Sequence, residues 1–176
     1  MSGHSKWAQI KRQKGSEDAK RSKLFGKLGS LIAAESRKSK GDITAPGLRT
    51  AIDKAKKENM PKDTIERAIK KGIGGEGDIM ESLTYEAYGP GGSALIIEAL
   101  TTNRNKAAQE IKHILSRNGA TLAQPGAAAW AFTKTIEGWE PNTTIPLSDA
   151  DGEILMRIID ELEDNDEVQD VFTNAN

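Results

Sequence analysis

The spacing of the apolar residues changes at Leu83, and this change limits the chain to a fold that mixes helices and sheet. Before Leu83 the apolar residues recur every three or four positions, as on one face of a helix, whereas the stretch LTYEAY alternates apolar and polar residues, as in a half-buried strand. The glycine-rich stretch GIGGEGD, residues 72–78, is typical of a linker. The sequence therefore predicts an α+β protein with a helical domain over residues 1–78 and an α/β domain over residues 79–176.

Three amphipathic helices are predicted in the first domain, and they are expected to form a three-helix bundle because none could bury its apolar face alone. Gly26 and Gly29 interrupt the first helix, so close packing against another helix is expected there. Gly72 is expected to end the third helix. The predicted helices run from the N-cap Ser16 to about residue 37, from about 46 to 58 and from about 62 to 71.

The second domain is predicted to be a sheet with two helices on one face. LTYEAY and SALIIEAL flank the turn signal Gly89-Pro90-Gly91-Gly92 and predict a β-hairpin over residues 83–100. Counted from Ser93, the predicted order is β-α-β-β-α-β, that of a ferredoxin-like sandwich, with residues 83–88 as an extra strand. After the hairpin, the predicted elements are a helix over about 105–118, strands over 127–133 and 143–147, a helix over about 151–164 and a strand over 168–173.

The net charge of the chain is −1, but the two predicted domains carry opposite charges. Residues 1–78 contain 19 Lys and Arg against 10 Asp and Glu, and residues 79–176 contain 6 against 16. This separation indicates two modules with different partners, because each field recruits molecules of opposite charge over about 8–10 Å, the Debye length at physiological salt. The alternative is that the two halves attract each other.

Cationic side chains are densest at the start of the chain, where the first 27 residues hold eight Lys and Arg against two acids. Phosphate oxygens are the usual partners of such a density, and Trp7 is expected to stack on a base or ribose. The alternative is that Trp7 and Ile10 fold back on the helices and that the lysines only solvate the surface. The predicted nucleic-acid-binding residues are Lys6, Trp7, Lys11, Arg12, Lys14, Lys20, Arg21, Lys23, Lys27, Arg49, Lys54, Lys56 and Lys57.

The sequence contains no constellation of residues that would serve catalysis. It has no cysteine, and His4 and His113 are its two histidines, so neither a thiolate nor a transition-metal site is expected. Residues 72–78 match G-x-G-x-x-G, but they follow a predicted helix and precede a strand, the reverse of a dinucleotide-binding turn. No run of 18 apolar residues or export signal is recognised. We therefore expect a cytoplasmic, non-enzymatic protein that binds no cofactor, metal or membrane.

Five stretches occur in the order GHSKWAQIKRQKGSEDAKRSKLFGKL, MPKDTIERAIKKG, YEAYGPGG, LTTNRNKA and LEDNDEVQDVFTNA. Together they resemble, from end to end of the chain, the YebC/PmpR family, which includes the mitochondrial translational activator of cytochrome c oxidase. The resemblance implies a helical domain followed by α/β domains, a cytoplasmic or organellar location and a role in gene expression without catalysis. Members are described as probable transcriptional regulators that bind DNA, and others as translation factors that act on the ribosome or on mRNA.

One departure from the family pattern lies in the second domain. Members usually carry a further α/β domain between the segments that match AAAWAF and TTIPLSDADGE, whereas only Lys134 to Asn142 lies between them here. The resemblance also draws attention to Asn103, Arg104 and Asn105 as a secondary polar site. The alternative is that these residues cap the helix that begins there.

Three functions are compatible with these observations. The first is a regulator of gene expression, transcriptional by resemblance, that binds DNA through the basic domain. The second is a translation factor that binds the ribosome, through ribosomal RNA, or mRNA with the same residues. The third is an adaptor that binds another protein through the acidic domain. The oligomeric state does not follow from the sequence.

Overall fold

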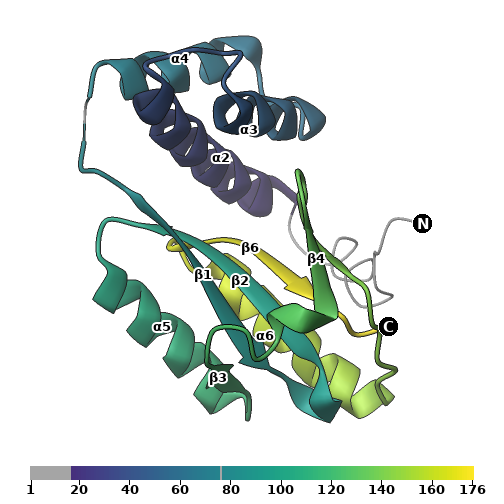
Figure 1. Cartoon of the computed structure of the whole chain (residues 1–176). Coiled ribbons are helices and arrows are strands. Elements are labelled where there is room, and N and C mark those ends of the chain that lie inside the picture. Colours follow the sequence, from purple (N-terminus) through teal and green to yellow (C-terminus); the bar gives the residue numbers. More distant parts are fainter. Residues whose placement is uncertain (1–16, 76) are drawn as a thin grey trace. The chain divides into compact units, whose positions relative to one another are not determined.

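The structure is a computed structural model that describes residues 17–75 and 77–176. The described residues form two units, a helical one that ends at Met80 and one built on a sheet that begins at Glu81 (Figure 1). The protein is therefore of the α+β class, as predicted. Ser16, the predicted N-cap of the first helix, lies outside the described residues.

The helical unit contains α2 (Glu17–Ser39), α3 (Pro46–Lys57) and α4 (Lys62–Ile73). Both α3 and α4 pack on α2 (Figure 1). The bounds agree with the predicted helices to within two residues, because the apolar spacing that predicts each helix is also the face that it buries. The buried core consists of Leu28, Ile32, Leu48, Ala51, Ala55, Met60 and Ile65.

Gly72 determines how closely α4 approaches α2. A Cβ atom at this position would lie 2.4 Å from the carbonyl oxygen of Ala33 and 2.6 Å from Cβ of Ser36, so no residue with a side chain fits without a shift of the backbone. At the same crossing, Ser36 Oγ donates a hydrogen bond of 2.7 Å to the carbonyl oxygen of Ile69. The two helices are therefore in backbone contact near their carboxyl ends.

The roles predicted for the glycines of this unit are wrong. Gly72 does not end α4, which continues past it, and it faces α2 because it lies on the same side of the helix as Ile65 and Ile69. Gly26 and Gly29 are not sites of close packing, since no atom of another segment lies within 4 Å of a Cβ added at either position. The glycine that allows two helices to pack closely is therefore Gly72 of α4, and not Gly26 or Gly29 of α2.

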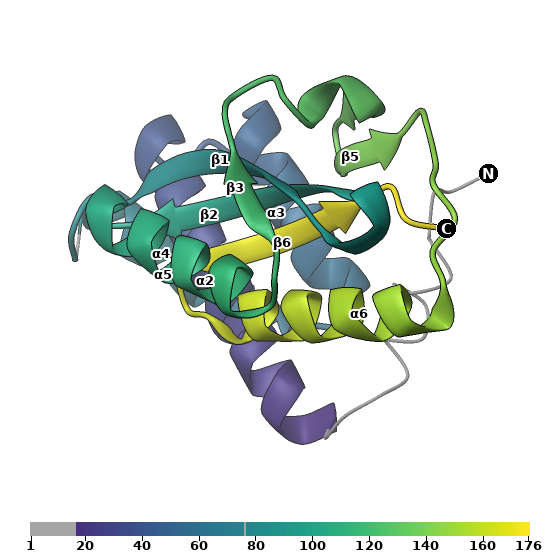
Figure 2. The same cartoon turned by 90° about the horizontal axis from the view of Figure 1, so that it is seen from below.

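The second unit is a four-stranded antiparallel sheet with α5 (Arg104–Arg117) and α6 (Asp149–Asp164) on one face (Figures 1 and 2). Since β2 (Ala94–Thr101) and β3 (Thr121–Ala123) are both antiparallel to β1 (Glu81–Tyr88), which lies between them, the connection through α5 is a split βαβ unit. In spatial order the strands are β3, β1, β2 and β6 (Val168–Thr173).

Two predicted strands are absent from this sheet. The stretch predicted as a strand over 127–133 forms a short 3₁₀-helix, η2 (Ala129–Ala131), followed by β4 (Phe132–Thr135). β4 pairs with β5 (Gly138–Pro141) in a separate two-stranded sheet. Of the strand predicted over 143–147, a single isolated bridge is present.

The strand order therefore differs from the predicted ferredoxin-like one. β1, expected as an added strand, is central, and β3, which was not predicted, lies at the edge beside it. The three residues of β3 are too few to show an alternation of apolar and polar positions. The prediction of the hairpin, of both helices and of the last strand is confirmed.

Apolar cores lie on both faces of the sheet. On the face that the helices cover, Leu95 of β2 belongs to a core with Ile111 of α5 and Leu155 of α6. On the opposite face, Ile96 of β2 belongs to a core with Phe132 of β4. Successive residues of β2 point to opposite faces, which explains why this strand is a nearly continuous apolar run.

Candidate nucleic-acid interface

The predicted nucleic-acid-binding residues that the structure describes lie on α2 and α3. On the first half of α2 they are Lys20, Arg21, Lys23 and Lys27. On α3 they are Arg49, Lys54, Lys56 and Lys57. The other predicted residues, which lie outside the described ones, are Lys6, Trp7, Lys11, Arg12 and Lys14.

Three lysines of α2 share one side of the helix. Lys20, Lys23 and Lys27 are spaced by three and four residues, which brings them to within about 60° of one another around the axis. Leu28 and Ile32 point in a different direction, into the core. The lysines therefore form a cationic stripe along the side of α2 without displacing any apolar contact.

α3 adds its own cations at the same end of the helical unit. Figure 1 shows α3 running back along α2, so that the carboxyl end of α3 and the first half of α2 lie toward the same end. Arg49 and Lys56 are two turns apart on the exposed side of α3, and the described part of the chain gives neither an ion-pair partner. Lys54, Lys56 and Lys57 of the last turn of α3 therefore lie toward the first half of α2, whereas Arg49 lies near the other end of α3.

Helix electrostatics explain part of this charge. The last turns of α3 and α4 carry three and two lysines, and a cation in that position favours the helix by about 0.3–1 kcal/mol because it faces the negative end of the dipole. Arg49 and Lys23 are not in a last turn, so this stabilisation does not account for them. Arg49 is exposed on α3, so its charge faces solvent.

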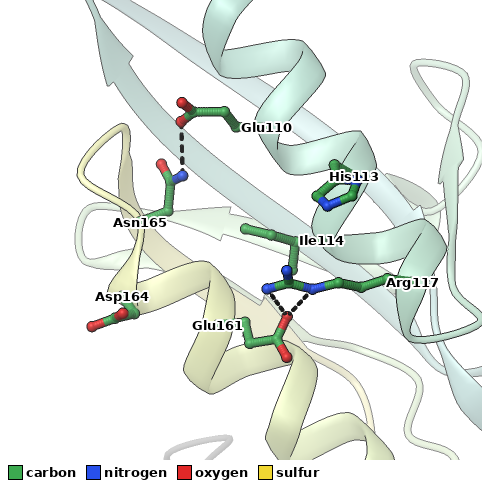
Figure 3. Close-up of a pocket in the computed structure, with 7 residues that line it drawn as sticks. All are labelled: Glu110, His113, Ile114, Arg117, Glu161, Asp164 and Asn165. Carbon is green, nitrogen blue, oxygen red and sulfur yellow. Dashed lines mark hydrogen bonds and ion pairs between the residues drawn. The ribbon is translucent and has the colours of Figure 1, made fainter.

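The sheet unit has a shallow groove of about 280 Å³ between α5 and α6 (Figure 3). Arg117 Nε donates a hydrogen bond of 2.8 Å to Glu161 Oε2, and Asn165 Nδ2 donates one of 2.8 Å to Glu110 Oε2. These polar groups form hydrogen bonds with one another across the groove, and the bonds connect α5 with α6 and the residue that follows it. Within residues 17–75 and 77–176, no group of three His, Cys, Asp or Glu side chains is placed to hold a metal ion.

The predicted polar site at the start of α5 contains a helix cap and an ion pair. Asn103 Oδ1 accepts a hydrogen bond of 3.1 Å from the backbone N–H of Lys106, so Asn103 is the N-cap, as the alternative prediction had it. Arg104 pairs with the Glu81 carboxylate, which raises the pKa of Arg104 above its ordinary value. Asn105 is exposed, and a binding role for these residues stays a prediction.

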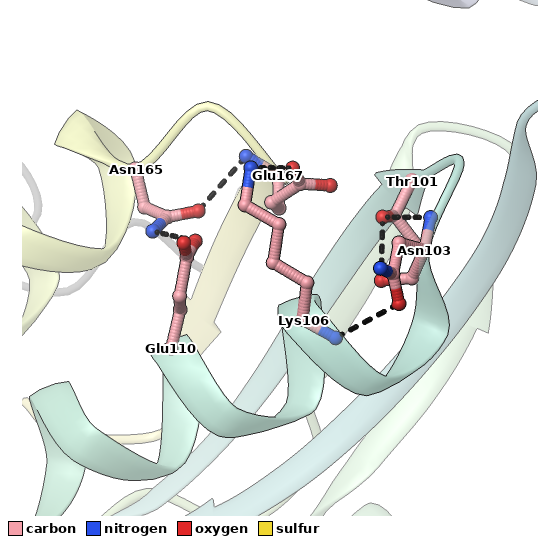
Figure 4. Close-up of polar contacts among 6 residues, drawn as sticks. All are labelled: Thr101, Asn103, Lys106, Glu110, Asn165 and Glu167. Atoms are coloured by element: carbon pink, nitrogen blue, oxygen red, sulfur yellow. Dashed lines mark hydrogen bonds and ion pairs between the residues drawn. The ribbon is translucent and has the colours of Figure 1, made fainter.

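Further polar contacts connect α5 with the turn before β6 (Figure 4). Lys106 Nζ lies 3.1 Å from Glu167 Oε1, and this contact raises the pKa of Lys106. Asn165 Oδ1 accepts a hydrogen bond of 2.8 Å from the backbone N–H of Glu167, while its amide group binds Glu110. The network holds the helix on the sheet and leaves few of these polar groups for a ligand.

Glu86 is a buried carboxylate that was not predicted as important. Its side chain accepts hydrogen bonds from the backbone N–H groups of Gly126 at 2.6 Å, Ala128 at 2.9 Å and Ala129 at 2.6 Å. Burial acts to raise the pKa of Glu86, but the three donors outweigh burial and hold this pKa below its ordinary value. The residue fastens the turn before β4 to β1. The alternation of LTYEAY gave no signal for this role, because it assigned Glu86 to a polar face.

We expect Glu86→Gln to destabilise the sheet unit by about 1–3 kcal/mol at neutral pH, because an amide replaces charge-assisted hydrogen bonds. The depressed pKa means that this contribution is complete above the unfolded pKa and is lost as the pH falls through the folded pKa. Urea unfolding followed by tryptophan fluorescence should therefore show a deficit in the free energy of unfolding that shrinks below about pH 4. Glu140→Gln, at an exposed position, is the matched control. An equal deficit at pH 7 and pH 3 would contradict the assignment.

The β4–β5 hairpin has a two-residue turn. Thr135 pairs with Gly138, so Ile136 and Glu137 form the turn, and Ile136 is 83% exposed. Trp139 Nε1 donates a hydrogen bond of 2.6 Å to Glu98 Oε1 on β2. This bond fixes the hairpin to the sheet.

No helix in the described ranges is long and apolar enough to cross a bilayer. Two family models match the chain. The TACO1/YebC protein N-terminal domain matches residues 5–75, and the TACO1/YebC second and third domain matches residues 80–137 and 136–175. The two segments of the second match meet at residues 136–137, in the turn of the β4–β5 hairpin.

Three relatives are each described as a probable transcriptional regulatory protein. That of Fervidobacterium nodosum is 39% identical over 235 residues, which cover 99% of this chain and 93% of the relative. That of Desulfatibacillum aliphaticivorans is 50% identical over 176 residues (98% and 69%), and that of Syntrophobacter fumaroxidans is 54% identical over 136 residues (76% and 55%). Because this chain has 176 residues, the 235-residue alignment includes positions of the relative that have no counterpart here.

A solved structure is also similar. The crystal structure of a conserved hypothetical protein from Aquifex aeolicus matches with a TM-score of 0.81 and 30% identity, and the match covers 98% of this chain and 97% of that one. The domain models, the relatives and this structure agree along nearly the whole sequence. The chain belongs to the TACO1/YebC family.

Proposed function

We propose that this chain is a non-enzymatic, cytoplasmic regulator of gene expression that binds DNA through its basic helical domain, residues 1–78. The observation that carries the proposal is the concentration of cations on α2 and α3, on surfaces that the core does not use. Backbone phosphates are the partner that such a surface fits, and they bind it without a catalytic group. The acidic domain, residues 79–176, repels nucleic acid and is free for other contacts.

Salt dependence tests the proposal. Binding to a duplex DNA should weaken by about 10³–10⁵-fold between roughly 50 and 200 mM salt if six to ten phosphates are contacted. Fluorescence anisotropy of a labelled duplex measures this change. Affinity that does not depend on salt would rule out phosphate contacts as the basis of binding.

Ribosome binding is the outcome that would redirect the proposal from transcription to translation. Ribosomal RNA offers the same phosphates as DNA, so the cationic surface does not choose between them. Co-sedimentation with ribosomes that is lost in the double variant Lys11→Glu, Lys14→Glu would favour a translation factor over a promoter-binding protein. If a protein partner still binds after residues 1–78 are deleted, that result would favour the third function, an adaptor that acts through the acidic domain.

A further inference from the structure

The carboxyl ends of α2 and α4 meet, and their meeting gathers cations that were not among the predicted binding residues. Gly72 lets α4 touch α2 at Ala33 and Ser36, which places the last turns of the two helices side by side (Figure 1). We call the resulting group the carboxyl-end cluster. It consists of Arg37, Lys38, Lys40, Lys70 and Lys71.

The carboxyl-end cluster is poor in compensating carboxylates. Lys38 Nζ lies 3.2 Å from Glu35 Oε1 in an exposed pair of the kind that contributes little to stability. Lys40, Lys70 and Lys71 are exposed, and among the described residues none has an ion-pair partner. The cations therefore repel one another in the free protein, and a bound polyanion would relieve this repulsion.

The helix dipole does not account for the whole cluster. Lys70 and Lys71 lie in the last turn of α4, where a cation is favourable, but Lys40 lies beyond the end of α2. Its backbone is left-handed, with φ of 55°, and the next residue, Gly41, donates a backbone hydrogen bond of 2.9 Å to Ser36. The chain thus holds an additional cation at a position where the helix does not need one.

The carboxyl-end cluster continues the cationic stripe of α2. Lys38 follows Lys20 by 18 residues, which is five full turns, so it lies on the same side of the helix as Lys20, Lys23 and Lys27. From Lys23 to Lys38 the helix rises about 22 Å at 1.5 Å per residue. This length corresponds to about six base pairs of duplex at 3.4 Å each.

We propose that the carboxyl-end cluster is a second phosphate-binding surface, and that a duplex lying along α2 contacts the stripe and the cluster together. The inference rests on the proposed nucleic-acid binding. It adds the position of the duplex on the helical unit and the length that the duplex must have. Both DNA and RNA duplexes supply such a row of phosphates, so each titration below is run separately on a DNA duplex and on an RNA duplex.

The test neutralises two cations of the cluster that come from different elements, Lys40→Gln with Lys71→Gln. On a duplex of about 15 base pairs the salt slope should fall by about 1.8, and the affinity near 100 mM salt by about 10- to 100-fold. A hairpin stem of about 5 base pairs is too short to reach both surfaces and can bind the stripe alone, so on this stem the variant should lose less affinity than on the long duplex. Lys112→Gln with Arg157→Gln, exposed cations of the sheet unit, is the matched control, and far-UV circular dichroism verifies folding.

The outcomes separate this inference from the proposed function. If the wild type binds duplex with a steep salt slope and the cluster variant matches it at both lengths, the inference is wrong and nucleic-acid binding stands. If the variant keeps its affinity for duplex but loses affinity for polyglutamate, the cluster serves an acidic protein and the inference is again wrong. If the wild type binds neither DNA nor RNA, both proposals fail.

Discussion

Replacing Gly72 with alanine should destabilise the helical unit by about 1–3 kcal/mol, although alanine favours a helix over glycine by about 1 kcal/mol. The added methyl group would lie 2.4 Å from the carbonyl oxygen of Ala33. That oxygen belongs to the backbone of α2, so the clash is relieved only if the two helices separate. Separation also weakens the hydrogen bond from Ser36 to Ile69 and opens the core beneath it.

Gly26→Ala is the matched control for this change. Gly26 also lies inside a helix, but no atom of another segment is within 4 Å of an added Cβ, so the same substitution should stabilise α2 by about 1 kcal/mol. Urea unfolding followed by circular dichroism at 222 nm reports the helices, and fluorescence in a Trp7→Phe background, which leaves Trp130 and Trp139, reports the sheet unit separately. Stabilisation by both substitutions would show that the helix crossing does not depend on Gly72.

Reversing two charges on α3, Arg49→Glu with Lys56→Glu, should weaken binding to duplex DNA by about 100-fold or more near 100 mM salt. Two phosphate contacts account for about 10- to 100-fold, and the new carboxylates add repulsion. Both side chains are exposed, so the core of the helical unit should be unaffected. Anisotropy titrations at several salt concentrations would give the affinity and the slope together.

Lys112→Glu with Arg157→Glu changes the net charge of the protein by the same amount on exposed positions of α5 and α6. If binding depends on a defined surface, this control should retain most of its affinity. Equal losses in the two double variants would mean that net charge, and not the surface on α3, governs binding. Thermal unfolding of each variant checks that Lys56→Glu, which opposes the dipole at the end of α3, has not melted the helix.

Local sequence signals were sufficient for the helices. The spacing of Leu28 and Ile32 and the turn at Pro61 depend only on neighbouring residues, and the corresponding bounds were predicted closely. The sheet depends on partners far apart in the sequence. AAAWAFT was predicted as a strand, yet its first five residues form a turn and a 3₁₀-helix, where Glu86, some 40 residues earlier, accepts hydrogen bonds from the backbone N–H groups of Ala128 and Ala129. Nothing within the stretch itself encodes that partner.

For the candidate site, the sequence predicted which segments are rich in cations but not how the fold brings these cations together. The density of cations in the sequence indicated α2 and α3, but the carboxyl-end cluster exists because Gly72 brings the ends of two helices together. The spacing of Lys38 from Lys71 in the sequence gives no sign of this. A packing contact, rather than a motif, creates the second group of cations.

The two-residue turn of the β4–β5 hairpin lies where the family match is divided, at residues 136–137. Strands that pair on either side of a turn hold its ends about 5 Å apart. A domain can therefore be added or removed at this turn without moving β4 or β5, provided that its own two ends are neighbours. Exchange of whole domains at this position would let relatives differ in size while they keep one sheet and one helical unit.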